Sequence, residues 1–171
     1  MCYRIPMQVI IRPIIPEDAH GALKVHHAAV RVTAANDYSA EIVEHWAPLP
    51  ITEKSIVRFN TNPEGELRFV ADWAGEIVAF AAIVVKKEEL RACYVAPSVT
   101  RQGVGRRLIR RLEQAAGERG ITALHLHSSV TAHPFYTAMG YETLEWGEHV
   151  LGSGLSMACV FMRKDLGLSS T

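Results

Sequence analysis

The order of apolar segments along the chain predicts an α/β (α+β) fold, with a mixed, mostly antiparallel central sheet of about seven strands and about four flanking helices. Two observations carry this prediction. Three closely spaced runs of strand length between residues 67 and 95 suit an antiparallel meander. A segment over 104–117 then repeats apolar residues every three or four positions, as an amphipathic helix packed on a sheet does.

The N-terminal part is expected to hold one strand and two helices. Residues 8–12 form a β-branched run that Pro13 ends, which predicts a first strand. Pro16, followed by two carboxylates, suits a first helical turn, because proline fixes the helical φ angle and carboxylates are stabilised by the helix dipole. A helix should follow to about residue 35, and a second one over 37–46 should end before two prolines.

The central part is expected to form the meander itself. A stretch rich in Asn, Pro and Gly at 60–66 predicts a loop. Runs at 67–73 and 77–85 then predict two strands joined by a hairpin that turns near Gly75. The run at 90–95 predicts a third strand of the same meander.

The C-terminal part should complete the sheet. After the amphipathic helix that ends at Gly117, residues 121–126 read as a strand and 132–139 as a short helix. Two final strands are predicted at 141–146 and 156–163.

Composition limits the classes of function. A length of 171 residues is typical of one domain, so we expect a single domain over 1–171. Eighteen basic residues balance eighteen acidic ones, which leaves no general field for a polyanion, so nucleic-acid binding is not expected. Cys2, Cys93 and Cys159 form no CxxC pair, so neither a disulfide framework nor a thiolate zinc site is predicted.

Location is also constrained by the sequence. No 18-residue apolar run is free of charge, so no membrane partner is expected. The apolar N-terminal stretch breaks at Arg12, too early for a secretion signal, and we therefore expect a cytoplasmic protein. Whether Met1 or Met7 is the natural start is left open.

The most informative segment, 94–106, runs from a strand through a Pro-marked loop into a helix that opens with Gly103 and Gly105. A helix N-terminus presents unpaired N–H groups and partial positive charge, and glycines let a pyrophosphate approach the backbone. A plain strand-to-helix turn is the simpler interpretation of two glycines. A dinucleotide fingerprint would need a third glycine where Leu108 stands, so that class of site fits poorly.

This segment resembles the V-x-P…R/Q-x-x-G-x-G/A motif with which the GNAT acetyltransferase superfamily binds acetyl-coenzyme A. Val95, Pro97, Gly103 and Gly105 match the motif, whereas Thr100 stands where Arg or Gln is usual. The resemblance implies a GNAT-like fold and backbone amide donors over 102–106. Its implied cofactor-binding residues here are Cys93, Tyr94, Val95, Arg101, Gln102, Gly103, Val104, Gly105, Arg106 and Arg107.

A second segment, 133–141, resembles the A-x-x-F-Y-x-x-x-G-F/Y helix of the same family. Ser129 stands where the family usually has Asn, and its hydroxyl could still contact the pantetheine arm. The resemblance places Phe135 and Tyr136 at the cofactor, with Tyr136 as the general acid that protonates the departing thiolate. The simpler interpretation is that these aromatics belong to the core and that Gly140 caps the helix.

Transfer to an amine also needs a proton acceptor, because an alkyl amine is mostly protonated at neutral pH. By resemblance Glu89, at the start of the strand that leads to Val95, is the candidate base, and His125 or His127 could replace it. A solvated charge at a hairpin end would explain Glu89 equally simply. The resemblance also implies that backbone N–H groups of 93–95 polarise the thioester carbonyl. Cys93 is interpreted as a buried residue rather than as the nucleophile of a ping-pong pathway.

The two histidines at 125 and 127 project from one sheet face, as a metal site would require, but no third ligand is evident, so no metal is expected. The acceptor should lie against the helical region before the meander. Its predicted wall residues are Tyr38, His45, Trp46 and His127. Carboxylates at 37, 41 and 44 share a helical face that could attract an amine or could simply be solvated.

Together these features predict an acetyltransferase that uses acetyl-CoA as cosubstrate and acts by direct attack of a primary amine, carried by a small molecule or a peptide. The alternative is a non-catalytic sensor that binds acyl-coenzyme A. An intact phenol at Tyr136 favours the enzyme, because binding alone does not need it. The apolar strand at 156–163 suits a homodimer interface as well as a core, so the oligomeric state is left open.

Overall fold

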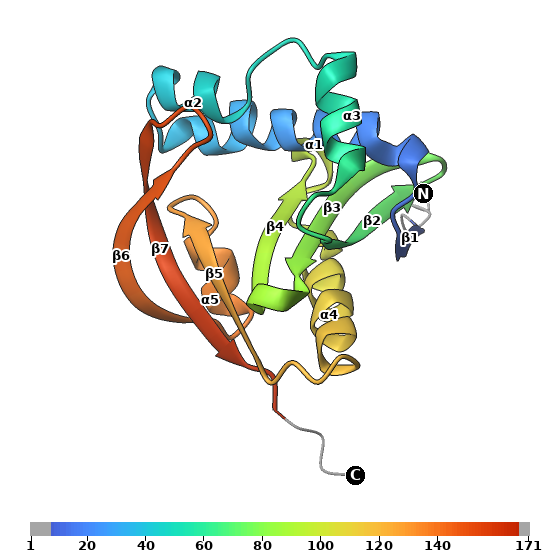
Figure 1. The fold of residues 1–171 in the computed structure, drawn as a ribbon, viewed down its shortest axis with the longest axis vertical. Coiled ribbons are helices and arrows are strands. Elements are labelled where there is room, and N and C mark those ends of the chain that lie inside the picture. Colours follow the sequence, from blue (N-terminus) through green and yellow to red (C-terminus); the bar gives the residue numbers. More distant parts are fainter. Residues whose placement is uncertain (1–7, 168–171) are drawn as a thin grey trace, which may run out of the picture.

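The computed structural model of the chain describes residues 8–167, and Met1, Cys2 and Met7 lie outside the described residues. All seven described strands join one sheet in the order β1-β2-β3-β4-β5-β7-β6 (Figure 1). Only β4 and β5 run parallel; the other neighbouring pairs are antiparallel. The predicted fold class, a mixed and mostly antiparallel sheet flanked by helices, is confirmed.

The strands and helices follow the predicted order with small shifts at their ends. The strands are β1 (Val9–Pro13), β2 (Leu67–Trp73), β3 (Glu76–Val84), β4 (Glu89–Val95), β5 (Ala123–Ser129), β6 (Glu142–Val150) and β7 (Ser156–Asp165). The helices are α1 (Ala19–Ala28), α2 (Ala40–Trp46), α3 (Glu53–Thr61), α4 (Val104–Gly117) and α5 (His133–Ala138). The final strand β7 lies inside the sheet, between β5 and β6, so its apolar residues serve the core.

One face of the sheet is covered by α4 and α5. The apolar stripe of α4 is buried as its periodicity predicted, with Leu108, Ile109 and Leu112 fully inaccessible. These side chains join one core cluster with Leu124 of β5 and Met162 of β7. Because burying a leucine stabilises the fold by about 1.5–3 kcal/mol, the apolar stripe of α4 contributes strongly to this core.

The opposite face of β3 and β4 is covered by α1 and α3 (Figure 1). The sequence analysis missed α3, which has no fully buried residue and contacts the core through Phe59, stacked edge-on against Phe80. A local signal was present, because Thr52 and Ser55 form a reciprocal capping box at its start.

The end of α1 departs from a regular helix. A π-helical stretch (Ala29–Thr33) and a 3-10 turn (Ala34–Asn36) continue it, in line with the predicted end near residue 35. The second helix begins later than the predicted residue 37, because the Ser39 hydroxyl accepts a hydrogen bond from the Ile42 N–H and caps α2 there. Residues 37–39 are therefore a turn between the helices.

The sheet parts in its middle. β4 and β5 form a single backbone pair, Glu89 with His125, and then diverge toward α1 (Figure 1). Near the paired end, the register between β3 and β4 shifts at Ala82 and Ile83, where Arg91 is left without an opposite residue. The later residues of β4 thus keep β3 on one side and have no strand partner toward β5.

Candidate active site

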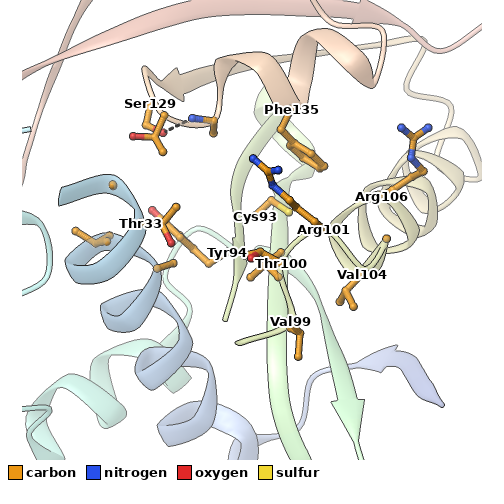
Figure 2. A pocket seen from close by; sticks show the side chains of 18 of the residues that line it. Thr33, Cys93, Tyr94, Val99, Thr100, Arg101, Val104, Arg106, Ser129 and Phe135 are labelled. Atoms are coloured by element: carbon orange, nitrogen blue, oxygen red, sulfur yellow. Dashed lines mark hydrogen bonds between the residues drawn. The ribbon is translucent and has the colours of Figure 1, made fainter. Parts of the chain in front are cut away.

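A cavity of about 580 Å³ opens where β4 and β5 part. Its walls come from the π-helical extension of α1, the end of β4, the first turn of α4 and the loop between β5 and α5 (Figure 2). The sequence analysis assigned ten of the lining residues to a cofactor site: Cys93, Tyr94, Val95, Arg101, Gly103, Val104, Gly105, Arg106, Ser129 and Phe135. The structure therefore brings the two motif segments together around one space.

Three predicted cofactor residues do not line this cavity. The Arg107 guanidinium points the other way and donates a hydrogen bond of 2.8 Å to the Val9 carbonyl of β1. Gln102 lies in the exposed loop before α4. Tyr136 is buried behind Phe135, with the two ring centroids 5.2 Å apart.

The first turn of α4 has the features of an anion site. Gly103 adopts a left-handed conformation (φ 80°) at the N-cap, and no side chain caps the helix there. The first N–H groups of the helix are thus left without a side-chain acceptor. Arg101 also adopts a positive φ of 61° and contributes a guanidinium to the cavity wall. Backbone N–H groups, the helix dipole and an arginine together suit a phosphate.

Gly105 is required for a different reason, the close approach of three elements. A Cβ atom at this position would lie 3.3 Å from the Phe135 ring of α5 and 3.3 Å from Val95 of β4. The absence of a side chain lets the first turn of α4 pack between both halves of the sheet at the edge of the cavity.

Two ionisable groups stay protonated beside the cavity. Burial, together with the neighbouring Cys93, Tyr94 and Tyr141, raises the pKa of Tyr136 well above its ordinary value. Burial also raises the pKa of the Cys93 thiol to about 12. At neutral pH Tyr136 is therefore a proton donor, and Cys93 is not a thiolate nucleophile.

Glu89 lies at the paired end of β4 and does not line the cavity. Its carboxylate accepts hydrogen bonds of 2.8 and 3.0 Å from Arg91, which also pairs with Glu64. Partial burial raises the pKa of Glu89, but the hydrogen bonds and charge of Arg91 lower it, and the net result is a pKa below the ordinary value. Glu89 is thus ionised at neutral pH but held by Arg91.

His127 offers a second basic group on the same stretch of sheet. Its ring is partly accessible to solvent, stacks edge-on against Phe161, with centroids 4.5 Å apart, and lies 5.8 Å from the ring of His149. Partial burial lowers the pKa of His127, although the charge of Glu89 opposes this shift. The ring is therefore neutral at pH 7 and can accept a proton.

Within residues 8–167, no group of three or more His, Cys, Asp or Glu could hold a metal ion.

The predicted acceptor wall is only partly assembled around the cavity. Trp46 lines it, whereas His45 is exposed on α2 away from it. The Tyr38 hydroxyl is engaged by the backbone of β7 and of the residue after β5. Of the three carboxylates on this segment, Asp37 accepts a hydrogen bond from Thr131, and the carboxylate at position 44 pairs with an arginine of the α1 extension.

Sequence reasoning missed the wall contributed by the α1 extension. Ala29, Val30 and Thr33 line the cavity, and the ring of His26, one helical turn earlier, stacks 4.5 Å from the ring of Tyr94. Burial lowers the pKa of His26 to about 4, so this ring is neutral. No local signal distinguishes these residues, because their role depends on where α1 crosses the end of β4.

Comparison with known proteins agrees with this architecture. The family profile described as acetyltransferase (GNAT) domain matches residues 34–166. A GCN5-related N-acetyltransferase from Rhodopseudomonas palustris is 28% identical with a TM-score of 0.83, over 96% of this chain and 99% of that chain. The PaiA N-acetyltransferase from Thermoplasma acidophilum, solved in complex with coenzyme A, is 22% identical with a TM-score of 0.71, over 93% and 99% of the two chains.

A phosphinothricin acetyltransferase of the GNAT superfamily from Sinorhizobium meliloti, solved with acetyl-CoA, is 17% identical with a TM-score of 0.70, over 96% of this chain and 91% of that chain. The search of curated proteins returns no match. Among the described residues, no helix has the length and hydropathy needed to span a bilayer. Because the matched profile covers most of the sequence, the chain belongs to the GNAT acetyltransferase family.

Proposed function

We propose that the chain is a cytoplasmic, acetyl-CoA-dependent N-acetyltransferase, formed by a single domain over 1–171, that acetylates a primary amine by direct attack without a metal. The observation that carries this proposal is the cavity between the parted strands, with an uncapped helix N-terminus on its wall and a buried phenol behind Phe135. The amine acceptor is a small molecule or a peptide; nucleic acid and membrane are not partners.

The cavity fits the cofactor in its chemistry. The first turn of α4 and Arg101 provide donors and positive charge for a pyrophosphate. The edge of β4 at Cys93–Val95, which lacks a strand partner toward β5, can pair with an amide-bearing arm as an added strand would. Phe135 and Ser129 complete the wall. Acetyl-coenzyme A supplies the acetyl group as a thioester, and everything else in the reaction falls to the chain's own residues.

Tyr136 is the proposed general acid. Burial raises the pKa of Tyr136 well above its ordinary value, which keeps the proton on the phenol until a stronger base appears. A departing thiolate is such a base once it is held in the same apolar surroundings. Proton donation of this kind typically accelerates a reaction by about 10²–10⁴-fold.

Glu89 is the proposed base, acting through water, and His127 is its alternative. The ion pair with Arg91 lowers the basicity of Glu89, whereas His127 is neutral and accessible. Separate Glu89→Gln and His127→Gln variants distinguish the two, because only loss of the true base removes the acid limb of the pH–kcat/KM profile.

The experiment that tests the function is a thiol-release assay with acetyl-CoA and a panel of amines, polyamines, amino acids, aminoglycosides and peptides. Tyr136→Phe should lower kcat by at least about 10²-fold while leaving the Kd for coenzyme A nearly unchanged. Tyr141→Phe is the matched control, because it removes a neighbouring buried phenol whose hydroxyl donates to Glu113. Coenzyme A binding without turnover on the whole panel would favour the sensor, and no binding at all would contradict both functions.

A further inference from the structure

The ladder between β5 and β7 stops where its register would allow one more pair. Ser129 pairs with Cys159, so the next antiparallel pair would join Val130 to Ala158. β7 itself continues regularly, because Ala158 still pairs with Glu148 of β6 on its other side. It is therefore β5 that leaves the sheet at this point.

The hydroxyl of Tyr38 occupies the place of the missing pair. It accepts a hydrogen bond of 2.7 Å from the Val130 N–H and donates one of 2.7 Å to the Ala158 carbonyl. Both backbone groups are thus satisfied, but through a side chain that lies 92 residues from one partner and 120 from the other in sequence. A hydroxyl between the two groups keeps β5 farther from β7 than a direct ladder bond would.

The segment displaced in this way is a wall of the cavity. Ser129, Thr131 and Ala132 line it, and the Ser129 hydroxyl accepts a hydrogen bond of 3.1 Å from the Ala132 N–H (Figure 2). The first turn of α5 follows directly, since the Tyr136 N–H donates to the Ala132 carbonyl at 3.1 Å. The position of the proposed general acid is therefore linked through one short loop to the bridge at Tyr38.

The Tyr38 bridge, in which the hydroxyl links Val130 to Ala158, is held in place by contacts from α2 and from the turn before it. The Tyr38 ring packs edge-on against Trp46, with centroids 5.5 Å apart, and Trp46 lines the cavity. The neighbouring Asp37 accepts a hydrogen bond of 2.7 Å from Thr131 in the same loop. Burial raises the pKa of Tyr38, so its hydroxyl remains a donor at physiological pH.

We propose that Tyr38 is a positioning residue: its hydroxyl replaces the next rung of the β5–β7 ladder and holds the 129–132 loop, with Tyr136 behind it, against the cofactor cavity. This role differs from the acceptor wall expected from the sequence. Its effects on turnover and on coenzyme A binding rest on the proposed function, whereas its effect on the loop does not.

Tyr38→Phe in the full chain is the test, because it keeps the ring packed on Trp46 and removes both hydrogen bonds. The retained ring blocks a direct bond between Val130 and Ala158, so the Val130 amide should exchange its hydrogen about tenfold faster, as expected for loss of roughly one hydrogen bond. The Kd for coenzyme A should rise about tenfold and kcat should fall by a similar factor, while the KM for the acceptor changes little.

Ser39→Ala is the matched control, since it removes the α2 cap from the same turn and leaves the bridge intact. It should leave Val130 exchange and the Kd for coenzyme A at wild-type values. A Tyr38→Phe enzyme in which only the acceptor KM rises would make Tyr38 an acceptor wall residue and overturn the proposal. A lower Tm with unchanged Val130 exchange and coenzyme A affinity would also overturn it. Hydrogen exchange at Val130 needs neither turnover nor coenzyme A, so failure of the proposed function would not obscure that result.

Discussion

The two halves of the sheet are each held by continuous strand pairing, but they are joined to each other by very little of it. β1 to β4 form one continuous antiparallel ladder, and β5, β7 and β6 form another. Between the halves the backbone contributes one pair, Glu89 with His125, and apolar side chains of α4, β5 and β7 meet in one core cluster. This difference indicates where a ligand can bind. Because β4 stops pairing with β5 after one residue pair, its remaining backbone groups can hydrogen-bond to a bound molecule.

The junction also separates two chemical environments. At the parted end the wall is largely apolar, and Cys93 and Tyr136 keep their protons. At the paired end, charged groups gather around Arg91, which binds both Glu89 and Glu64. Changes at the parted end should therefore affect cofactor binding, and changes at the paired end should affect stability and its pH dependence.

The largest effect is expected from filling the space at Gly105, where both halves meet the first turn of α4. Gly105→Val would press on Phe135 and Val95, and overpacking of this kind costs about 1–3 kcal/mol. Because Gly105 lines the cavity, the affinity for coenzyme A, measured by calorimetry, should drop by roughly tenfold to a hundredfold. Gly117→Val on the same helix faces open space and should leave affinity unchanged. Equal coenzyme A affinities for both variants would mean that the contact of Gly105 with Phe135 and Val95 does not shape the cofactor site.

A smaller effect is expected from cutting the ion pair that ties α4 to β7. Lys164 lies 2.8 and 3.0 Å from the two Glu113 oxygens, and Tyr141 also donates to that carboxylate. Lys164→Met should lower the free energy of unfolding by about 1.5 kcal/mol, because a half-buried carboxylate loses its charged partner. Arg163→Met breaks the neighbouring, exposed pair with Asp165 and should cost less than about 0.5 kcal/mol in the same denaturant titration. If both variants lose the same free energy of unfolding, the Lys164–Glu113 pair does not contribute specially to the contact between α4 and β7.

A pH-dependent effect is expected at the paired end. Partial burial raises the pKa of Glu89 and Arg91 lowers it, with a net pKa below the ordinary 4.5, so the ionised carboxylate stabilises the fold above about pH 4.5 and this contribution is lost as pH falls through the folded pKa. Glu89→Gln should therefore be less stable than wild type at pH 7 by about 0.5–1 kcal/mol, since solvent screens the pair, and the difference should vanish at low pH. Between pH 7 and 8 the difference should stay constant, which serves as the internal control. A difference that grew on acidification would contradict the ion-pair assignment.

The smallest effect is expected at Cys93, whose thiol is protonated at neutral pH because burial raises its pKa to about 12. Cys93→Ala should reduce kcat by less than about threefold, as only the backbone of this residue is assigned a role. Mass spectrometry of the wild-type protein after mixing with acetyl-CoA should detect no acetylated cysteine. An acetylated Cys93 together with an inactive variant would instead establish a covalent pathway.

Much of this molecule could be predicted from its sequence. The strands, α4 and the loop before it follow from patterns within a few residues, such as the stripe through Leu108 and Leu112. The helix α3 was missed although its capping box at Thr52 and Ser55 is a local signal. For the site, the motifs predicted ten lining residues of the cavity but placed Arg107 there as well, and its contact with Val9 spans 98 positions.

The sequence by itself determined the strands, most of the helices, their order and the two segments that meet at the cavity, because periodicity, caps and glycine conformations are decided by near neighbours. Only the tertiary structure decided where β4 and β5 part, that Arg91 also pairs with Glu64, and that Tyr38 takes the place of a ladder rung. The physical reason is that these contacts depend on how whole elements pack, and residues such as Tyr38 and Ala158 carry no local mark of a partner 120 positions away.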